Sequence, residues 1–491
     1  MAMKLANVAL AVASCLVLPI EARLTRRAFP GSLEALFGPY VSPGTEIASS
    51  SDANFSSVVT GRWTSWEAPT FSGAIKPVTE HDLQEIVRIA SANHIPFLAT
   101  SGGHGAGLGY ASVTGLDINL ANFNCVSVDV DRNELVVGAG VSIGDLIEPL
   151  YEAGKAVPHG NENCVGFLGA TLGGGIGVGT GILGLGVDSL KSARVLVASG
   201  DIVTSSEHHH PDLFWAIRGA GANFGIVVSA TFELQEQAND GNTVTASFTY
   251  DGAKNASVLE FFRSFDDTLP DELAITLHFS YNTTLKQSQV ALDYVYFGQL
   301  SDVQQYIDAA NALGPLSSSH EILTIPELYE SLEHNECTIN SPISGATAGI
   351  GEIDVPTFQA IFAEFVAFAA ANPTTYVGES AWQRYSNKKA LAQPANSTSF
   401  PWRDIKAYWL HLNVFLSPTI EDAVTNMTLS LREKLNAGSG FDTPHVYVNY
   451  AYGDEGPAAW WSAANLPRLR ALKARWDPRN LFGKANSVLA Q

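Results

Sequence analysis

The chain has 491 residues, of which 46% are hydrophobic and only 16% charged, a composition that predicts two globular domains rather than extended disorder. Its 28 basic residues stand against 49 acidic ones, and no stretch resembles the basic patch on which nucleic-acid binding depends. Nucleic acid is therefore excluded as a partner, and the net charge of −21 favours a soluble protein.

The first predicted element in chain order is a secretory signal over residues 1–22. Lys4 precedes an apolar run that ends at Leu18, and Ile20-Glu21-Ala22 offers a cleavage site. The run is short and poorly flanked for a membrane span, so we expect a secreted monomer without a membrane partner. In a secreted protein, five Asn-x-Ser/Thr sequons mark candidate glycosylation sites on the surface: Asn54, Asn255, Asn282, Asn396 and Asn426.

Hydrophobic periodicity then predicts an α+β chain with a change of texture near residue 240. Thr79 and Asp82 form a capping box for a helix over 79–92. Further elements before residue 240 are strands at 96–100, 116–120, 135–139, 193–198, 202–204 and 225–234 and a short helix capped by Ser142. Beyond residue 240, the pattern predicts a large, mainly antiparallel sheet flanked by helices. The predicted strands cover 244–250, 274–281, 290–297 and 407–415, and the predicted helices cover 258–265, 303–313 and 358–370. The last predicted helix covers 466–474.

The cysteine count argues against a disulfide framework. Cys15 lies in the predicted signal, which leaves Cys125, Cys164 and Cys337. Three cysteines cannot all pair within one molecule, so at least one thiol should be free.

His104 stands alone among glycines, in Ser101-Gly102-Gly103-His104-Gly105, directly after an apolar run. Glycine permits positive φ and lets a large ligand approach the main chain, which favours a cofactor site. A tight turn with an exposed histidine is the alternative for this segment alone. The later stretch 160–186 is too glycine-rich for a regular helix or strand. Its Gly179-x-Gly181-x-x-Gly184 lacks the preceding strand of a dinucleotide fingerprint, so we interpret the glycines as a slot whose amides cradle a pyrophosphate.

Several motifs, in order, resemble the FAD-binding domain of the vanillyl-alcohol-oxidase superfamily. They are Ser101-Gly102-Gly103-His104, Pro158-His159-Gly160, Val165-Gly166, Gly173-Gly174-Gly175, Gly186-x-Asp188, Asp212-Leu213-Phe214-Trp215-Ala216-Ile217-Arg218-Gly219 and Asn223-Phe224-Gly225-Ile226-Val227. Three C-terminal motifs narrow this resemblance to the berberine-bridge-enzyme-like oxidases. They are Tyr447-x-Asn449-Tyr450, Arg468-Leu469 and Trp476-Asp477-Pro478-x-Asn480-Leu481-Phe482.

The resemblance implies a PCMH-type FAD-binding domain over 67–239, a substrate domain over 240–444, and terminal segments, 23–66 and 445–491, that pack on the FAD domain. In that family the histidine at the position of His104 bonds covalently to the flavin. The other implied cofactor contacts are Ser101, Gly102, Gly103, Gly105, Val165, Gly166, Gly169, Gly173, Gly174, Gly225, Ile226, Val227 and Asn449. No metal is implied.

Two departures from the family pattern matter. Thr100 occupies a place where many members have arginine, so one polar contact is missing. Members with a second flavin bond use a cysteine in Cys-x-x-Val-Gly, and alignment on Val165-Gly166 puts Glu162 at that place, with Cys164 two positions too late. We therefore predict a single tether through His104, with Cys164 as a small buried hydrophobe; a shifted loop that lets Cys164 bond the flavin is the alternative. By resemblance, Val165 leaves a path for oxygen open and favours an oxidase.

Tyr450 matches the tyrosine that acts as the general base in several family members. Alternation along a strand over 446–450 would direct Val446, Val448 and Tyr450 to one face, and an ordinary edge-strand tyrosine is the alternative. Two predicted strands present further candidates for the substrate site: Trp409, His411, Asn413 and Phe415 on one, and Thr276, His278 and Ser280 on the other. His208-His209-His210 invites a metal interpretation, but three consecutive loop residues do not readily converge on one ion.

These features predict a secreted FAD-dependent oxidase that passes hydride from a small alcohol or secondary metabolite to the flavin and then to O2, giving H2O2. An oxidative cyclase of secondary metabolism is the alternative among enzymes. A secreted flavin-binding protein without turnover is the alternative from another class.

Overall fold

Four β-sheets organise the part of the chain that the computed structural model describes, residues 32–332, 337 and 340–490. The predicted signal over 1–22 lies outside this part. A four-stranded sheet has the order β1-β2-β4-β3, with β1 Glu46–Ser49, β2 Thr70–Lys76, β3 Phe97–Thr100 and β4 Thr114–Asn119. Strand β4 runs parallel to both β2 and β3. Short helices α1 Leu33–Phe37 and α2 Phe55–Val58 precede β2.

Helix α3 (Glu80–Ala92) covers the four-stranded sheet and confirms the predicted capping box. The Thr79 side chain accepts a hydrogen bond from the Asp82 amide, and the Asp82 side chain accepts one from the Thr79 amide. The apolar stripe that includes Leu83, Ile86 and Val87 is fully buried against the sheet. The capping box thus identified the start of this helix, and the helical spacing of its apolar residues identified its buried face.

A five-stranded antiparallel sheet completes the N-terminal lobe, which we define as residues 32–236. Its order is β5-β6-β10-β8-β9, with β5 Val126–Asp129, β6 Glu134–Gly138, β8 Leu190–Leu196, β9 Ile202–Ser206 and β10 Ile226–Glu233. A two-stranded sheet joins β7 Lys155–Ala156 to β11 Gln235–Glu236. The remaining helices of the lobe are α4 Gly144–Glu152, α5 Phe167–Thr171, α6 Thr180–Leu183, α7 Gly186–Ser189 and α8 Pro211–Ala220. Helices α5, α6 and α7 interrupt the glycine-rich stretch, and each has only four or five residues.

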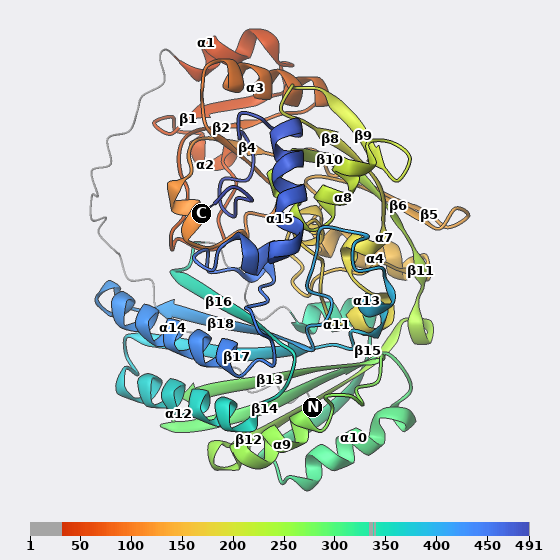
Figure 1. Cartoon of the computed structure of the whole chain (residues 1–491), viewed down its shortest axis with the longest axis vertical. Helices are drawn as coiled ribbons and strands as arrows, with labels where there is room; N and C mark the ends of the chain where they lie inside the picture. The colour runs from red at the N-terminus through yellow and green to blue at the C-terminus, as the bar shows by residue number, and fades with distance from the viewer. Residues whose placement is uncertain (1–31, 333–336, 338–339, 491) are drawn as a thin grey trace.

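The second lobe, residues 242–437, is a seven-stranded antiparallel sheet covered by helices on one face (Figure 1). Its order is β15-β12-β14-β13-β17-β18-β16, with β12 Asn242–Asp251, β13 Leu273–Asn282, β14 Gln287–Tyr296, β15 Ser317–Thr324, β16 Ile343–Ile350, β17 Tyr376–Arg384 and β18 Ala407–Phe415. The covering helices are α9 Asn255–Arg263, α10 Leu300–Ala312, α12 Val355–Ala371 and α14 Glu421–Ala437, while α11 Ile325–Leu332 and α13 Lys388–Ala392 lie elsewhere in the lobe. In Figure 1 the other face of the sheet looks toward the N-terminal lobe. The α+β class and the large antiparallel sheet are as predicted.

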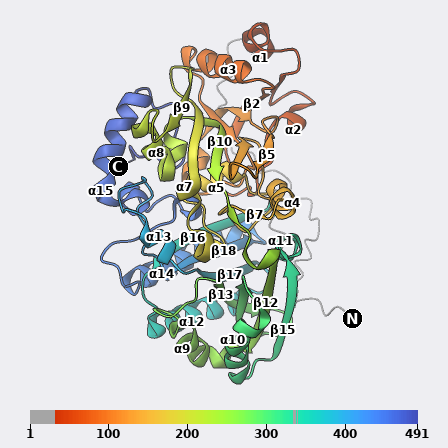
Figure 2. The same cartoon turned by 90° about the vertical axis from the view of Figure 1, so that its right-hand side faces the viewer.

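The C-terminal segment returns to the N-terminal lobe, where α15 (Pro457–Trp476) lies beside α8 (Figure 2). The Arg468 guanidinium lies 3.8 Å from the ring centroid of Trp215, and the Trp461 indole donates to the Gly219 carbonyl. Among the described residues, no helix combines the length and apolarity that a membrane crossing requires.

A buried ion pair fastens the end of this segment. The side chains of Lys473 and Asp477 are buried, with exposures of 1% and 0%. The Lys473 Nζ and Asp477 Oδ2 atoms are 2.6 Å apart. Lys473 also donates to the Asn223 and Phe482 carbonyls. Because a buried charge needs several partners, this set holds the C-terminal segment in one position on the lobe.

Candidate active site

His104 lies in the loop after β3, with its imidazole partly buried beside Trp63. The two rings stack with centroids 5.9 Å apart and planes inclined by 18°. Burial, aided by the positive charge of Arg62, lowers the pKa of His104 to about 4. At neutral pH the imidazole is therefore uncharged and keeps a nitrogen lone pair, which is the state required of a nucleophile.

The glycines next to His104 admit other parts of the protein. Gly103 has a φ of +74°, and a Cβ there would lie 2.0 Å from the Gly61 carbonyl oxygen. A Cβ on Gly102 would lie 2.5 Å from the Gly166 amide nitrogen. The sequence predicted that these glycines let a ligand approach. In the structure they let two other loops pack against the loop that carries His104.

Arg62, which sequence reasoning missed, brings a cation to this loop. Its guanidinium donates to the Gly105 carbonyl and lies 5.3 Å from the ring centroid of Tyr110. Thr100, at the end of β3, donates its hydroxyl to Asp117. Arg62 lies outside any periodic segment, so the sequence carried no signal for it.

The second glycine run meets the C-terminal segment. A Cβ on Gly173 would lie 2.0 Å from Asn449 Oδ1, and one on Gly174 would lie 2.8 Å from a ring carbon of Tyr447. Asn449 Nδ2 donates to the Ala170 carbonyl at 2.7 Å and to the Tyr447 hydroxyl at 2.8 Å. Asn449 therefore fixes the C-terminal segment against α5 and the loop that follows it.

The remaining predicted cofactor residues lie on neighbouring segments. Val165 and Gly166 lead into α5, and Gly169 is exposed on that helix with open space around it. Gly225, Ile226 and Val227 lie at the start of β10, where the side chains of Ile226 and Val227 are buried in the core.

Buried polar atoms near His104 indicate that the residues present fit FAD. Within the described residues, Ser101 Oγ and Trp63 Nε1 are buried without a hydrogen-bond partner. Unpaired buried polar atoms are unfavourable, so such groups point to a ligand that completes them. FAD, with its polar ring edge, ribityl chain and pyrophosphate, offers both donors and acceptors.

Tyr450 connects the C-terminal segment to the seven-stranded sheet. Its hydroxyl donates to Gln383 Oε1 on β17 at 3.0 Å, and its ring meets that of Tyr447 edge to face, with centroids 4.9 Å apart. The predicted strand over 446–450 was wrong. Residues Val448–Tyr450 form a single 3-10 turn, closed by the Tyr450 amide on the Tyr447 carbonyl, because the Asn449 side chain binds back to α5.

The predicted substrate-lining face of β18 was wrong, whereas that of β13 lies on the side of the sheet away from the helices and its role stays a prediction. Trp409 and His411 of β18 point into the core beneath the helices, where both are fully buried. Burial lowers the pKa of His411 to about 4, and its Nδ1 pairs with the Ser380 hydroxyl at 2.7 Å. Asn413 is also fully buried and Phe415 nearly so. His278 lies on the opposite face, which sequence periodicity could not distinguish because both faces of the sheet carry aromatic or polar residues.

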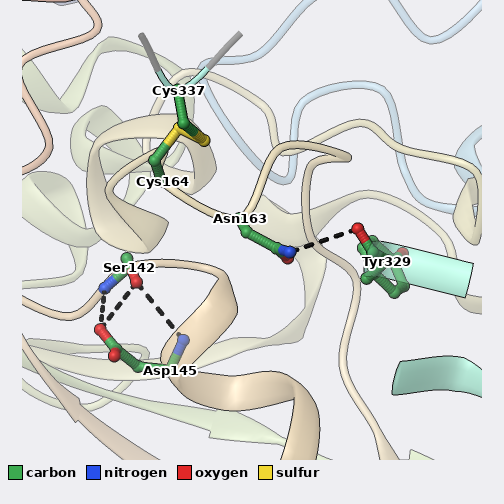
Figure 3. Close-up of a disulfide and its surroundings, with 6 residues drawn as sticks. All are labelled: Ser142, Asp145, Asn163, Cys164, Tyr329 and Cys337. Carbon is green, nitrogen blue, oxygen red and sulfur yellow. Dashed lines mark hydrogen bonds between the residues drawn. A yellow bond between two sulfur atoms is a disulfide. The ribbon is translucent and has the colours of Figure 1, made fainter. Parts of the chain in front are cut away.

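A disulfide joins Cys164 to Cys337, contrary to the prediction that Cys164 is a small buried hydrophobe (Figure 3). The sulfurs are 2.02 Å apart, and 173 positions separate the two residues in sequence. The same loop is held by Asn163, whose Nδ2 donates to the Tyr329 carbonyl at 3.2 Å. The bridge ties the loop beside His104 to the second lobe and occupies the thiol that a second flavin bond would need. Cys125 is the free, exposed cysteine among the described residues.

Replacing Cys337 with serine should lower the apparent melting temperature by roughly 3–8 °C, because a bridge across a long loop contributes about 2–5 kcal/mol to stability. Thermal unfolding followed by circular dichroism measures this, with Cys125→Ser as the matched control that should leave the transition unchanged. The variant should also expose one more thiol to a thiol reagent than the wild type. Equal melting temperatures for all three proteins would contradict the stabilising role of the bridge.

The other singled-out residues lie on the surface. His210 Nδ1 pairs with the Thr204 carbonyl at 2.8 Å, and in the described part of the chain no group of three or more His, Cys, Asp or Glu side chains is arranged to hold a metal ion. Three of the sequon asparagines are exposed, namely Asn54, Asn396 and Asn426. The other two, Asn255 and Asn282, are partly buried.

Two family models match the two chain segments that contribute His104 and Tyr450 to this site. The family model described as FAD binding domain matches residues 71–206, and the one described as berberine and berberine like matches residues 446–489. The FAD-linked oxidoreductase afoF of Emericella nidulans is 50% identical over 466 residues, which cover 94% of this chain and 96% of that protein.

Solved structures share the fold. BBE-like 1 of Physcomitrella patens superposes with a TM-score of 0.81 at 20% identity and covers 94% of this chain and 100% of its own. The glucooligosaccharide oxidase of Acremonium strictum, described as carrying a 6-S-cysteinyl, 8α-N1-histidyl FAD, gives a TM-score of 0.81 at 21% identity, covering 93% and 99%.

Proposed function

The chain belongs to the berberine-bridge-enzyme-like FAD-linked oxidoreductases, and on that premise we propose that it is a secreted oxidase with FAD tethered at His104. It oxidises a small alcohol or secondary metabolite and passes the electrons to O2, which leaves as H2O2. The observation that carries the proposal is a continuous set of contacts across the two lobes. Gly102 lies against Gly166, whose helix α5 holds Asn449, and the neighbouring Tyr450 reaches the sheet.

The chain's own residues supply attachment and orientation. Bound FAD supplies the hydride acceptor. His104, uncharged at neutral pH, supplies the nitrogen for a covalent bond, and Ser101 together with the glycine-rich loops would hold the cofactor. Since the disulfide occupies Cys164, we propose His104 as the only tether.

Tyr450 takes the hydroxyl proton of the substrate as the adjacent carbon is oxidised. In the structure the Tyr450 hydroxyl donates to the Gln383 carbonyl oxygen. A deprotonated Tyr450 needs a donor in place of an acceptor, and rotation of the Gln383 amide presents its NH2 group. Gln383 can therefore hold Tyr450 in place in both protonation states, which makes it the positioning residue of the pair.

Export is supported by the disulfide and the sequons. A disulfide persists in oxidising compartments and is rare in the cytosol, and Cys164–Cys337 is therefore better suited to a secreted protein. Three sequon asparagines are exposed, as glycosylation requires. The position of Val165 supports the use of O2 by family resemblance.

Anaerobic bleaching of the flavin absorbance should identify the substrate class. We expect at least one member of a panel of sugars, phenols and polyketide alcohols to bleach it, and admission of air to restore the colour with release of peroxide. Bleaching without peroxide would contradict the oxidase assignment. A ring-closed product would identify the cyclase alternative, and bound flavin that no compound bleaches would favour a binding protein.

A further inference from the structure

A group of charged side chains lies on the same face of the seven-stranded sheet as Gln383. In the antiparallel register, Gln383 pairs with Thr276, and Thr276 pairs with Asp293 on the next strand. Residues paired in register share a face, so Asp293 and Gln383 point to the same side. The helices pack on the other side, where Leu277 and Phe279 are buried.

His278 joins two carboxylates on this face. Its Nε2 lies 3.1 Å from Asp293 Oδ2, and its Nδ1 contacts Glu379 Oε1. The side chains of His278, Asp293 and Glu379 are 24%, 43% and 51% exposed, so the group borders open space. We call these three residues the His278 cluster.

The His278 cluster lies within reach of a ligand held at Tyr450. With strands spaced at about 4.8 Å and residues at about 3.3 Å, His278 lies about 8 Å and Asp293 about 10 Å from Gln383 between Cα atoms. Gln383 itself bonds the Tyr450 hydroxyl. A molecule of two rings positioned at Tyr450 can therefore extend along the sheet to the cluster.

The chemistry of the cluster selects a hydrogen-bond donor. Burial acts against a charged ring, but Glu379 and Asp293 outweigh it and raise the pKa of His278 to about 10. The ring thus stays protonated and directs both N–H groups at the carboxylates. Two carboxylates and one imidazolium leave a net charge of −1, and each carboxylate can accept several hydrogen bonds in addition to that from the ring. The cluster should attract hydroxyl groups and repel carboxylates.

We propose that the His278 cluster is a substrate-recognition site that binds a hydroxyl group at the end of the substrate remote from Tyr450. The inference rests on the proposed function, and it names the substrate class as neutral compounds of about two rings with a distal hydroxyl. Phenols and sugars both carry such a group. An exposed ion pair contributes only about 0–1 kcal/mol to stability, so the variants below should remain folded.

Calorimetric binding to the dithionite-reduced holoenzyme tests the site without turnover. The probes are a naphthalenemethanol with a hydroxyl on its second ring, its O-methyl ether, and cellobiose. Asp293→Asn and Glu379→Gln should each weaken the hydroxylated probe about 10- to 100-fold, the range for a lost hydrogen bond to a charged group, and leave the ether unchanged. Glu260→Gln, in an exposed ion pair on α9, is the matched control and should change neither. The same loss for cellobiose instead of the naphthol would identify a sugar as the source of the hydroxyl.

The proposal is overturned if the variants bind all three probes as the wild type does, or if the wild type binds none of them. Equal weakening of the hydroxylated probe and its ether would also overturn it, because a general distortion of this face of the sheet would then be the cause. The anaerobic bleaching panel reports independently. If a compound bleaches the flavin but the variants do not discriminate between the hydroxylated probe and its ether, the role of the His278 cluster alone is rejected. If the variants discriminate between these probes but no compound bleaches the flavin, only the oxidase function is rejected.

Discussion

Replacing His104 with alanine will abolish covalently bound flavin. A denatured wild-type sample resolved on a gel should keep the yellow fluorescence of the flavin, and the variant should lose it. The reason is chemical, since alanine offers no nucleophile at the position where burial and Arg62 keep an uncharged imidazole. Mass spectrometry of the intact chain provides the second measurement and should show the loss of one FAD.

His209→Ala is the matched control for this experiment, because His209 is an exposed loop histidine. It should retain the full flavin signal. Fluorescence that survives denaturation in His104→Ala would sink the attachment assignment. A further variant, Cys337→Ser with His104→Ala, separates the two candidate tethers, since it frees the Cys164 thiol without restoring the histidine.

Tyr450→Phe should lower the rate of anaerobic flavin reduction by about 10²-fold while flavin remains bound, within the range for a lost general base. The substitution removes only the hydroxyl that contacts Gln383. Stopped-flow absorbance with the substrate found by the panel measures the rate directly. Gln383→Leu should give a smaller loss, because it removes the positioning partner and leaves the hydroxyl.

Tyr447→Phe is the matched comparison for Tyr450. Burial raises the pKa of Tyr447 to about 12 despite the hydrogen bonds from Asn449 and Gly175, so its phenolate is unfavourable at neutral pH. We expect less than about a 10-fold loss in this variant. If Tyr447→Phe and Tyr450→Phe fall equally, the assignment of Tyr450 as the base is wrong and the pair acts as a structural unit.

Local chemistry made many elements of this fold predictable. The capping box of Thr79 and Asp82 identified the start of α3, and alternation identified β18 over the residues that form it. Such signals depend on neighbours within a few positions along the chain. Strands β16 and β17 were missed because glycine and small polar residues, as in Ile343–Ile350, weaken the alternation.

Features that depend on distant partners were not predictable in the same way. The strand predicted around Tyr450 is a turn because Asn449 binds Ala170, a contact between residues 279 positions apart. The disulfide was missed because counting cysteines tests whether all can pair and does not show which two come together. Cys164 and Cys337 meet only after the lobes pack.

The sequence by itself determined the α+β class and the family motifs, because these depend on short runs of residue types. It also singled out His104 and Tyr450, whose reactive roles stay predictions. Only the tertiary structure decided which residues surround them: Arg62 beside His104, Gln383 beside Tyr450, and the His278 cluster on the face of the sheet away from its helices. The physical reason is that a strand's two faces look alike in sequence until helices cover one of them. The covered face of β18 buries Trp409 and His411, and the other face of the sheet looks toward the N-terminal lobe (Figure 1).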